Sequence, residues 1–327
     1  MPIPWKEFAS IVQSNQRFLL TSHIRPDCDA LGSELGMAGV LESLGKQVTI
    51  VNGHATPPSL AFIDPQRRIK TLGVDVTAGQ LEAIDVLMIL DTSAWAQLGP
   101  MSDVIRATKA RRVLVDHHVG EDELGATIFK DTSAEATGRL VVEAAEELGV
   151  RLTPEIAMPL FAAIATDTGW FRFGSVGSVT YRAAAKLIDA GAKPSAIYRD
   201  LYEQDTLARM KLRGVILSHI TNELDGRLAY THVSLADFQQ TGALASDTED
   251  VVNSLLNIAG TQVAVIFVEQ ASGGFKISFR SRSSFDCNQL ASKFGGGGHK
   301  AAAGAFVASS LDVALPQVLD AVRAAMT

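Results

Sequence analysis

Residues 21–32, TSHIRPDCDALG, place a histidine and two aspartates, His23, Asp27 and Asp29, within seven positions. They follow the apolar run RFLL at residues 17–20. Two carboxylates this close repel each other, and neither stays ionised in a dry site without a compensating cation. The stretch therefore predicts a bound cation whose remaining ligands come from elsewhere in the chain.

Acidic and histidine side chains also end three later segments. They are Asp91 in AIDVLMILDTS (83–93), Asp116, His117 and His118 in RRVLVDHH (111–118), and Asp167 in EIAMPLFAAIATDTG (155–169). The first two segments have the near-continuous apolar pattern of buried strands, and the third that of a buried helix. The carboxyl ends of strands in an open parallel sheet form one crevice, which is the usual ligand position. We therefore expect all these side chains to converge in space.

The expected metal ligands are four carboxylates and two imidazoles, from His23, Asp27, Asp29, Asp91, His117 and Asp167. Four negative charges require about four positive charges, which two divalent cations supply. Imidazole and carboxylate ligands without thiolate favour Mn²⁺, followed by Mg²⁺, Co²⁺ or Fe²⁺. Two ions roughly 3.5–4 Å apart would share a bridging water and clamp an in-line attack on phosphorus. A lone aspartate is more often a helix cap, as Asp29 could be for the helix after it, so the prediction depends on the joint occurrence.

The first half of the chain alternates between predicted strands and helices. The strands are RFLLTSH (17–23), KQVTIVN (46–52), 83–93 and 111–118, and the helices are 29–45, 133–149 with a serine cap, 155–169 and 178–191. Strands that alternate with helices and are apolar throughout indicate a parallel sheet covered on both faces. We predict an α/β domain over residues 1–191.

The remaining chain has a different character. The charged segment 192–214 is expected to be a helical linker. Predicted strands follow at 227–235, 261–270 and 274–282, and ASGG between the last two indicates a hairpin. A short helix, a glycine run and a final helix over 310–326 complete a smaller α/β domain, residues 215–327.

A second segment with chemical potential is SFRSRSSFDCNQLASKFGGGGHKAAAG, residues 278–304. From Gly273 to Gly304 it carries five lysines and arginines against Asp286 alone. The four glycines before His299 allow close approach of the backbone to a ligand and offer N–H donors to phosphate. The segment predicts a phosphate site, and the alternative is a flexible hinge.

The bulk properties exclude several classes of protein. A formal charge of −7 argues against tight, sequence-independent binding along duplex DNA. The two cysteines, Cys28 and Cys287, form no disulfide framework and fit a reducing cytoplasm. We expect neither a signal peptide nor a membrane span, because the longest uncharged run, 251–268, is interrupted by polar residues and Gly260.

Together these segments resemble the DHH phosphoesterase superfamily, and more closely the bacterial nanoRNase/pAp phosphatase family, which has a RecJ-like catalytic core. The resemblance covers nearly the whole chain, from TSHIRPDCDALGSELGM through LDTS, VDHH, SAEATG and ATDTGWF to FRSR and FGGGGHKAAAG. It implies a DHH domain linked to a smaller DHH-associated domain, with the active site in the cleft between them.

The resemblance also implies a role for each matching residue. His23, Asp27 and Asp91 would hold one Mn²⁺, and Asp29, Asp91, His117 and Asp167 the other, with Asp91 bridging. Among the catalytic residues, His118 would stabilise charge on the scissile phosphate and Asp116 would orient an imidazole. In the smaller domain Arg280, Ser281 and Arg282 would grip a terminal phosphate, and Gly296, Gly297, Gly298 and His299 would line the other side.

The resulting hypothesis is a Mn²⁺-dependent hydrolase of short 5′-phosphorylated RNA that releases nucleoside 5′-monophosphates and also converts 3′-phosphoadenosine 5′-phosphate to AMP. Within the enzymes, the alternatives are a cyclic or linear dinucleotide phosphodiesterase, a pyrophosphatase or exopolyphosphatase, and a processive RecJ-like exonuclease. The alternative of another class is a nucleotide-binding module without catalysis. A homodimer formed through the DHH domain fits the resemblance.

Overall fold

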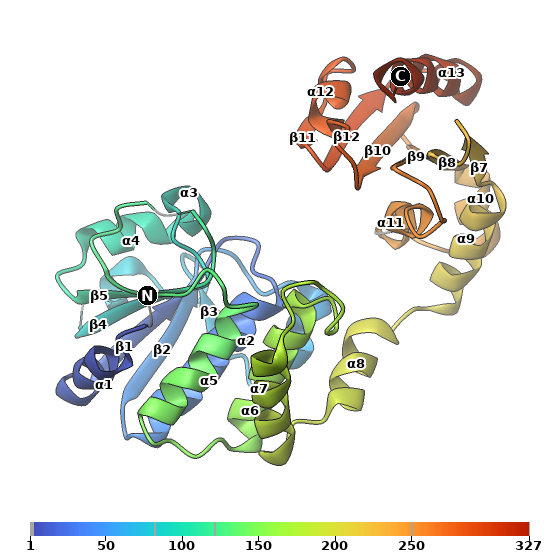
Figure 1. Cartoon of the computed structure of the whole chain (residues 1–327). Coiled ribbons are helices and arrows are strands. Elements are labelled where there is room, and N and C mark those ends of the chain that lie inside the picture. The colour runs from blue at the N-terminus through green and yellow to red at the C-terminus, as the bar shows by residue number, and fades with distance from the viewer. Residues whose placement is uncertain (1–2, 82, 121, 250, 327) are drawn as a thin grey trace. The chain divides into compact units, whose positions relative to one another are not determined.

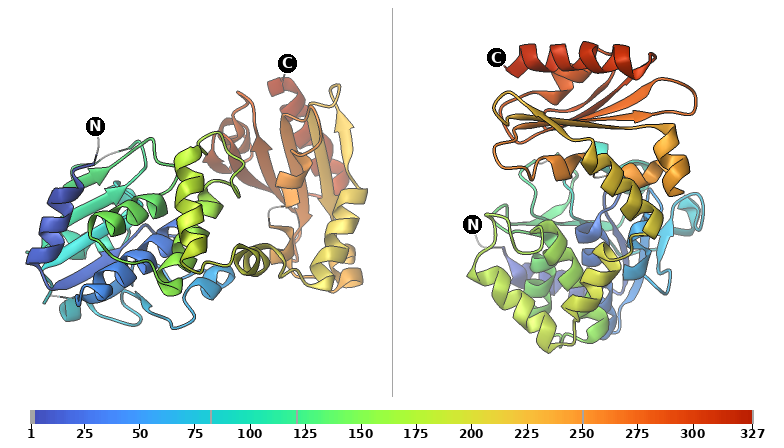
Figure 2. Two further views of the ribbon diagram at one scale, coloured as in Figure 1. Left: turned by 60° about the horizontal axis from the view of Figure 1, so that its bottom comes forward. Right: turned by 90° about the vertical axis from the view of Figure 1, so that its right-hand side faces the viewer.

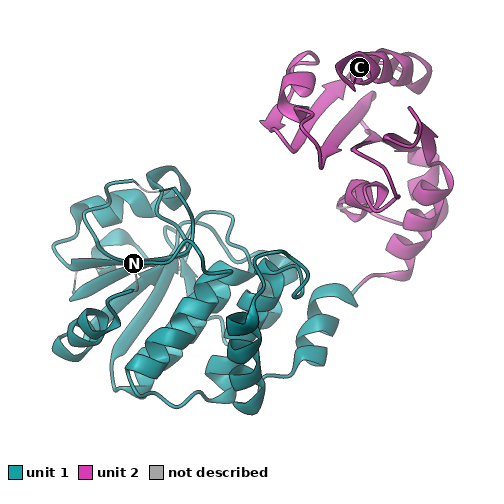
Figure 3. Ribbon diagram, in the orientation of Figure 1, with its two compact units in different colours: residues 1–204 teal, residues 205–327 magenta. Residues whose placement is uncertain are grey.

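The computed structural model describes residues 3–81, 83–120, 122–249 and 251–326. The chain divides into two compact units, residues 1–204 and 205–327 (Figure 3). The boundary falls inside the charged segment 192–214. That segment forms two separate helices, α8 (Pro194–Tyr202) at the end of unit 1 and α9 (Leu207–Ser218) at the start of unit 2.

Unit 1 is built on a six-stranded sheet in which every neighbouring pair of strands is parallel. Its strands are β1 (Arg17–Thr21), β2 (Gln47–Asn52), β3 (Ile69–Thr71), β4 (Val86–Leu90), β5 (Arg111–Asp116) and β6 (Thr127–Lys130). They are arranged in the order β3-β2-β1-β4-β5-β6. The predicted parallel sheet is confirmed. The strands missed by the sequence, β3 and β6, are the two short edge strands.

Helices cover both faces of this sheet (Figure 1). They are α1 (Trp5–Ser14), α2 (Cys28–Ser43), α3 (Trp95–Leu98), α4 (Met101–Ala107), α5 (Thr137–Glu147), α6 (Pro154–Asp167) and α7 (Ser178–Asp189), with short 3₁₀ helices at Pro58–Ile63 and Ala78–Leu81. Alternation along β1 shows the two layers: Phe18 and Leu20 pack with α1, α2, α5 and α6, whereas Leu19 packs with α3 and α4. Both faces are buried, which explains why the strands are apolar throughout.

Glycines on one side of α2 allow the closest helix contact of unit 1. A Cβ atom on Gly32 would lie 2.9 Å from the Ala163 Cβ and clash with the carbonyl oxygen of Pro159, and one on Gly39 would lie 2.6 Å from Ile156 Cγ1. The order of these contacts shows that α2 and α6 run antiparallel. The first turn of α2 and the last turn of α6 therefore lie at the same end of the pair.

Unit 2 contains a mixed six-stranded sheet in the order β11-β12-β10-β9-β8-β7. Its elements after α9 are β7 (Thr221–Glu223), β8 (Leu228–Val233), α10 (Leu235–Thr241), a 3₁₀ helix (Ala245–Thr248), α11 (Val251–Leu255), β9 (Val263–Glu269), β10 (Phe275–Ser281), α12 (Cys287–Ser292), β11 (Gly297–His299), β12 (Ala302–Val307) and α13 (Leu311–Met326). Strands β9 and β10 form the predicted antiparallel hairpin. The end of the glycine run forms the short strand β11, which was not among the predicted strands.

The faces of the unit 2 sheet are covered from two sides. Val263, Val265 and Phe267 of β9 face α12 and α13, and the alternate residues Ala264 and Ile266 face α9 and α11. The right-hand view of Figure 2 shows α13 along one face and α9 along the other. Among the described residues, no helix is both long and apolar enough to cross a membrane.

The close contact between α2 and α6 gives a prediction for stability. Gly32→Ala should lower the free energy of unfolding of unit 1 by about 1–3 kcal/mol, because the new methyl group meets a backbone carbonyl that cannot rotate away. Thermal and urea unfolding would measure the change. Gly79→Ala is the control: a Cβ there meets nothing within 4 Å, so its effect should stay within about 0.5 kcal/mol. Equal effects of the two substitutions would contradict the packing argument.

Candidate metal centre

The order of the unit 1 strands predicts where a ligand binds. The sheet continues from β1 towards β2 and β3 on one side and from β4 towards β5 and β6 on the other, so the connections change direction between β1 and β4. Such a switch point leaves a crevice at the carboxyl ends of the two strands. His23 follows β1 by two residues, and Asp91 follows β4 directly.

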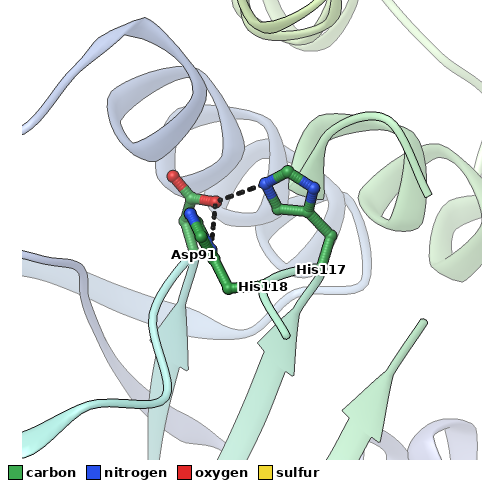
Figure 4. A group of neighbouring side chains, drawn as sticks. All are labelled: Asp91, His117 and His118. Carbon is green, nitrogen blue, oxygen red and sulfur yellow. Dashed lines mark ion pairs between the residues drawn. The ribbon is translucent and has the colours of Figure 1, made fainter. Parts of the chain in front are cut away.

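The structure brings the six expected ligands together at this edge. His23 Nε2 lies 3.5 Å from Asp91 Oδ2 and 3.8 Å from Asp27 Oδ1. His117 Nε2 lies 3.5 Å from Asp91 Oδ1, 3.5 Å from Asp167 Oδ2 and 3.7 Å from Asp29 Oδ2. Figure 4 shows Asp91 and His117 pointing toward each other from the ends of β4 and β5. The two oxygens of Asp91 thus face two different imidazoles, as a bridging carboxylate requires.

Each imidazole is oriented by a backbone carbonyl. His23 Nδ1 lies 3.0 Å from the oxygen of Ile24, and His117 Nδ1 lies 3.2 Å from the oxygen of Ala134. When Nδ1–H donates to a carbonyl, the lone pair of Nε2 is free to bind a metal. Both rings therefore present Nε2 to the carboxylates.

The side chain of Asp29 lies at the N-terminus of α5, which begins 108 positions later in the sequence. Its Oδ2 accepts a hydrogen bond from the backbone N–H of Thr137 at 2.7 Å, and its Oδ1 accepts one from Gly138 at 2.9 Å. A carboxylate at a helix N-terminus is stabilised by these otherwise unpaired N–H groups. Asp29 therefore caps α5 and not, as its position allowed, the helix that follows it.

The predicted serine cap of the 133–149 helix is wrong. The helix begins at Thr137, and Ser133 instead donates to Asp131 in the preceding turn. Asp29 supplies the cap because tertiary contact brings it to the first free N–H groups of α5. The helix after His23 is capped by Asp27, whose Oδ1 accepts from Ala30 N at 3.0 Å.

Asp91 adopts a backbone conformation that is uncommon for a residue with a side chain. Its φ angle is +64°, in the left-handed region that aspartate and asparagine tolerate better than most residues. Its N–H donates to Val115 O at 3.0 Å, and Oδ1 accepts from the Thr137 hydroxyl at 2.9 Å. These contacts hold the carboxylate in the centre of the cluster.

Burial and mutual repulsion disfavour charge on these carboxyls. Burial raises the pKa of Asp29, and burial followed by the negative charge of Asp29 raises the pKa of Asp91 well above its usual range. The same two causes raise the pKa of Asp167 to about 6. Burial opposes charge on His23, but hydrogen bonds to Asp27 and Asp91 outweigh it and raise its pKa to about 11. Divalent cations would compensate the negative charge of these carboxyls and favour their ionised forms.

The donor set fits two metal ions. His23, Asp27 and Asp91 form one group with ligand atoms within 4.8 Å of one another, and Asp29, His117 and Asp167 form a second. Oxygen and imidazole nitrogen donors without thiolate suit Mn²⁺, Mg²⁺ or Co²⁺. The side chains can therefore hold two cations with Asp91 between them.

His118 and Asp116 form a separate arm beside the metal ligands. His118 Nδ1 lies 2.9 Å from Asp116 Oδ1 and 3.8 Å from Asp91 Oδ1 (Figure 4). The hydrogen bond to Asp116 is the main cause that raises the pKa of His118. Burial opposes charge on Asp116, but its hydrogen bonds to His118 and the charge of Lys130 lower its pKa to about 2.

Sequence reasoning missed two residues of this site. Lys130, at the end of β6, is nearly buried, and its Nζ lies 3.2 Å from Asp116 Oδ2 and 2.8 Å from the hydroxyl of Ser93. Thr137 donates to Asp91, although it belongs to the SAEATG stretch already noted. The sequence signal for Lys130 is a lysine directly after the apolar residues Ile128 and Phe129.

In unit 2, the expected phosphate-binding residues divide between the two faces of the sheet. Arg280 pairs with Ala302, which pairs with His299, so these three residues share one face. Ser281 is buried, its hydroxyl accepts from Ser283 N, and Arg282 is exposed.

The glycines of this segment have different structural reasons. A Cβ on Gly296 would clash with Gly304 O, and one on Gly298 would lie 2.6 Å from Ala302 O, so β11 could not approach β12. A Cβ on Gly297 would meet only Asn288 Oδ1, at 3.6 Å. Neither Gly295 nor Gly297 is therefore required by packing against β12.

Comparisons with known proteins agree with this architecture. The model of the DHH family, N-terminal domain, matches residues 17–164, and that of the DHHA1 domain matches residues 225–327. The chain is 32% identical over 309 residues to the bifunctional oligoribonuclease and PAP phosphatase NrnA of Thermus thermophilus, covering 94% of this chain and 90% of that protein.

Two solved structures share the fold. An exopolyphosphatase-related protein from Bacteroides fragilis has a TM-score of 0.82 at 26% identity, covering 98% of this chain and 94% of that one. The exonuclease RecJ, in a crystal structure bound to manganese, has a TM-score of 0.52 at 15% identity, covering 99% and 94%. The chain belongs to the DHH phosphoesterases, in the family of the bifunctional oligoribonucleases and PAP phosphatases.

Proposed function

We propose that this protein is a two-metal phosphoesterase that hydrolyses short 5′-phosphorylated oligoribonucleotides to nucleoside 5′-monophosphates and 3′-phosphoadenosine 5′-phosphate to AMP. The observation that carries the proposal is Asp91, whose two oxygens face His23 and His117. The name of the Thermus thermophilus relative supports both substrates. Both reactions break a phosphate ester at a 3′ oxygen, so one site serves both.

The metal ligands are assigned as two overlapping sets. His23, Asp27 and Asp91 would hold one Mn²⁺, and Asp29, Asp91, His117 and Asp167 the other. Mg²⁺ or Co²⁺ would also suit these donors. Two divalent cations, when bound, supply Lewis acidity that polarises the phosphate and favours ionisation of an attacking water.

The side chains beside the metal ligands act on the substrate. Asp116 holds His118 through Nδ1, which leaves Nε2 to interact with the scissile phosphate or to protonate the departing 3′ oxygen. Hydrogen bonds to His118 and Ser93, together with the charge of Lys130, favour the ionised form of Asp116, which holds His118 in place and raises its pKa. This arrangement places positive charge where negative charge develops during the reaction.

Substrate binding is assigned to the smaller domain. We assign catalysis to residues 1–191, the connection to 192–214 and substrate recognition to 215–327. Arg280, Ser281 and Arg282 would grip the terminal phosphate, and Gly296, Gly297, Gly298 and His299 would line the other side. Arginine suits this role because its guanidinium donates two parallel hydrogen bonds to phosphate.

We further expect a cytoplasmic homodimer. The two cysteines are buried and free, as in a reducing compartment. Light scattering would measure the oligomeric state. The reaction depends on neither expectation, because the expected metal ligands all come from one chain.

Product analysis tests the proposed function. Purified protein with Mn²⁺ would receive pApA, a 5′-phosphorylated 24-mer RNA, 3′-phosphoadenosine 5′-phosphate and cyclic di-AMP in parallel, with EDTA as control. We expect fast conversion of pApA and of the bisphosphate to AMP and slow attack on the 24-mer. Faster turnover of the cyclic dinucleotide would favour a second-messenger phosphodiesterase. Metal binding without any cleavage would favour a binding module.

Asp91→Asn tests the bridging carboxylate. The variant should lose at least about a thousandfold in kcat for pApA, or roughly 4 kcal/mol of transition-state stabilisation, because both metal ions lose a charged ligand. Asparagine tolerates the left-handed backbone of Asp91, so the fold should be retained. Bound Mn²⁺ per chain should fall in parallel. Asp103→Asn, at an exposed carboxylate of α4, is the matched control, and near-normal activity of Asp91→Asn would refute the two-metal assignment.

Arg280→Ala tests recognition of the terminal phosphate. It should raise KM for pApA by about 10- to 100-fold, the range expected for loss of a hydrogen bond to a charged group, and leave KM for unphosphorylated ApA within about twofold. Lys211→Ala removes an exposed positive charge from α9 and serves as control. An equal effect of Arg280→Ala on both dinucleotides would remove Arg280 from phosphate recognition.

A further inference from the structure

An unusual turn follows the metal ligand Asp167. Gly169, Trp170 and Phe171 have φ angles of +56°, +61° and +61°, three consecutive residues in the left-handed region. Glycine adopts this conformation readily, but bulky residues such as Trp170 and Phe171 rarely do, because it is strained for them. Such strain persists only where the surrounding structure enforces it, and it is concentrated at functional sites.

Hydrogen bonds to Thr168 enforce the turn. The Thr168 hydroxyl donates to Ile164 O at 2.6 Å and accepts from Phe171 N at 3.0 Å. The carbonyl of Thr168 accepts from the N–H groups of Arg172 and Phe173 at 2.9 and 3.1 Å. The loop between α6 and α7 is thus fixed to the end of α6 that carries Asp167 (Figure 1).

Most of the neighbouring aromatic rings are held in place by one another. Trp170 contacts Tyr198 and Tyr202 of α8, with ring centroids 5.0 and 5.8 Å apart. Phe171 packs on Phe161 and stacks on Tyr181. These contacts fix Trp170 and Phe171 against α6, α7 and α8, which explains how their backbone conformation is maintained.

Phe173 is the exception in this turn. Its side chain is 51% exposed. A Cβ on Gly169 would lie 2.5 Å from Phe173 Cε1, so the ring lies directly against this glycine, two residues after Asp167. The ring thus lies against the backbone of Gly169, and its exposed part is open to a planar ligand at the turn that follows Asp167.

A positive charge accompanies the exposed ring. Arg172 Nε donates to Gly169 O at 2.6 Å, which anchors the exposed side chain and leaves its terminal nitrogens to interact with an anion. Across residues 3–81, 83–120, 122–249 and 251–326, no carboxylate forms an ion pair with Arg172. An aromatic ring next to an unpaired guanidinium is the combination that binds single-stranded nucleic acid, by base stacking and phosphate contact.

We propose that Phe173 is the stacking platform for a nucleobase adjoining the scissile phosphate, and that Arg172 contacts the phosphate of that nucleotide. The strained turn serves to present both side chains beside Asp167. The inference rests on the proposed function and adds to it a base-recognition element in the catalytic unit. Stacking on Phe173 would favour nucleotides over phosphate esters that lack a base.

The test compares substrates that differ only in a base. Phe173→Leu keeps an apolar side chain over Gly169 and removes the aromatic face, and Phe173→Trp keeps a ring. Each variant would be assayed with pApA and with two analogues, in which the 5′ or the 3′ nucleoside lacks its adenine. Phe306→Ala, at a phenylalanine of unit 2 that is 48% exposed, is the control.

Phe173→Leu should lower kcat/KM for pApA by roughly 5- to 100-fold, the range that base–aromatic stacking covers. The loss should disappear for the one analogue that lacks the stacked base, and Phe173→Trp should restore activity. Mn²⁺ affinity should be unchanged, which shows that Asp167 is undisturbed. An equal loss on all three substrates, or no loss on any, would overturn the inference. Failure of the wild-type protein to cleave pApA would instead refute the proposed function.

Discussion

Four carboxylates lie close together at one edge of the unit 1 sheet, and their mutual repulsion must be compensated by the groups around them. Asp91 is the centre of this cluster, because it is buried, follows β4 directly and lies between two imidazoles. Burial and the negative charge of Asp29 raise the pKa of its carboxyl well above the usual range. The imidazoles, the Thr137 hydroxyl and the expected cations all act to stabilise the same buried charge.

Helix N-termini also stabilise two of these carboxylates. Asp27 caps α2 and Asp29 caps α5, so two of the acids rest on the positive ends of helices. Asp167 lies at the opposite kind of terminus, the last residue of α6, where the helix itself is unfavourable to a carboxylate. The imidazoles of His117 and His118 lower the pKa of Asp167 and so partly offset this effect. The glycines of α2 bring these termini together by letting α2 and α6 approach closely.

Sequence patterns predicted the elements that are locally determined. The apolar runs before Asp91 and Asp116 had to be buried strands, and parallel strands present their carboxyl ends at one edge, so the convergence of the acids followed from order alone. The cap of α5 could not be predicted from local sequence, because 108 positions separate Asp29 from Thr137. Lys130 was missed because its contact with Asp116 is also tertiary. A lysine at the end of a short edge strand normally points into solvent. For Gly298 the sequence analysis considered only the approach of a ligand. The structure gives another reason for glycine there, because β12 approaches closely.

The buried carboxylate of Asp116 connects Lys130 to His118. One of its oxygens contacts the ammonium of Lys130, and the other contacts the ring of His118. The ammonium of Lys130 is almost without solvent, and its carboxylate partner is fully buried. A buried ion pair contributes little net stability, since desolvation offsets most of the attraction, so stability is a weak reason for its presence. The carboxylate of this ion pair also orients His118. That ring is half-exposed, and its Nδ1 lies 2.9 Å from Asp116 Oδ1. The hydrogen bond to this carboxylate holds the ring in place and raises the pKa of His118, and the ring lies 3.8 Å from Asp91 Oδ1. The arm therefore places an imidazole that favours positive charge beside the bridging carboxylate, as the proposed role of His118 requires.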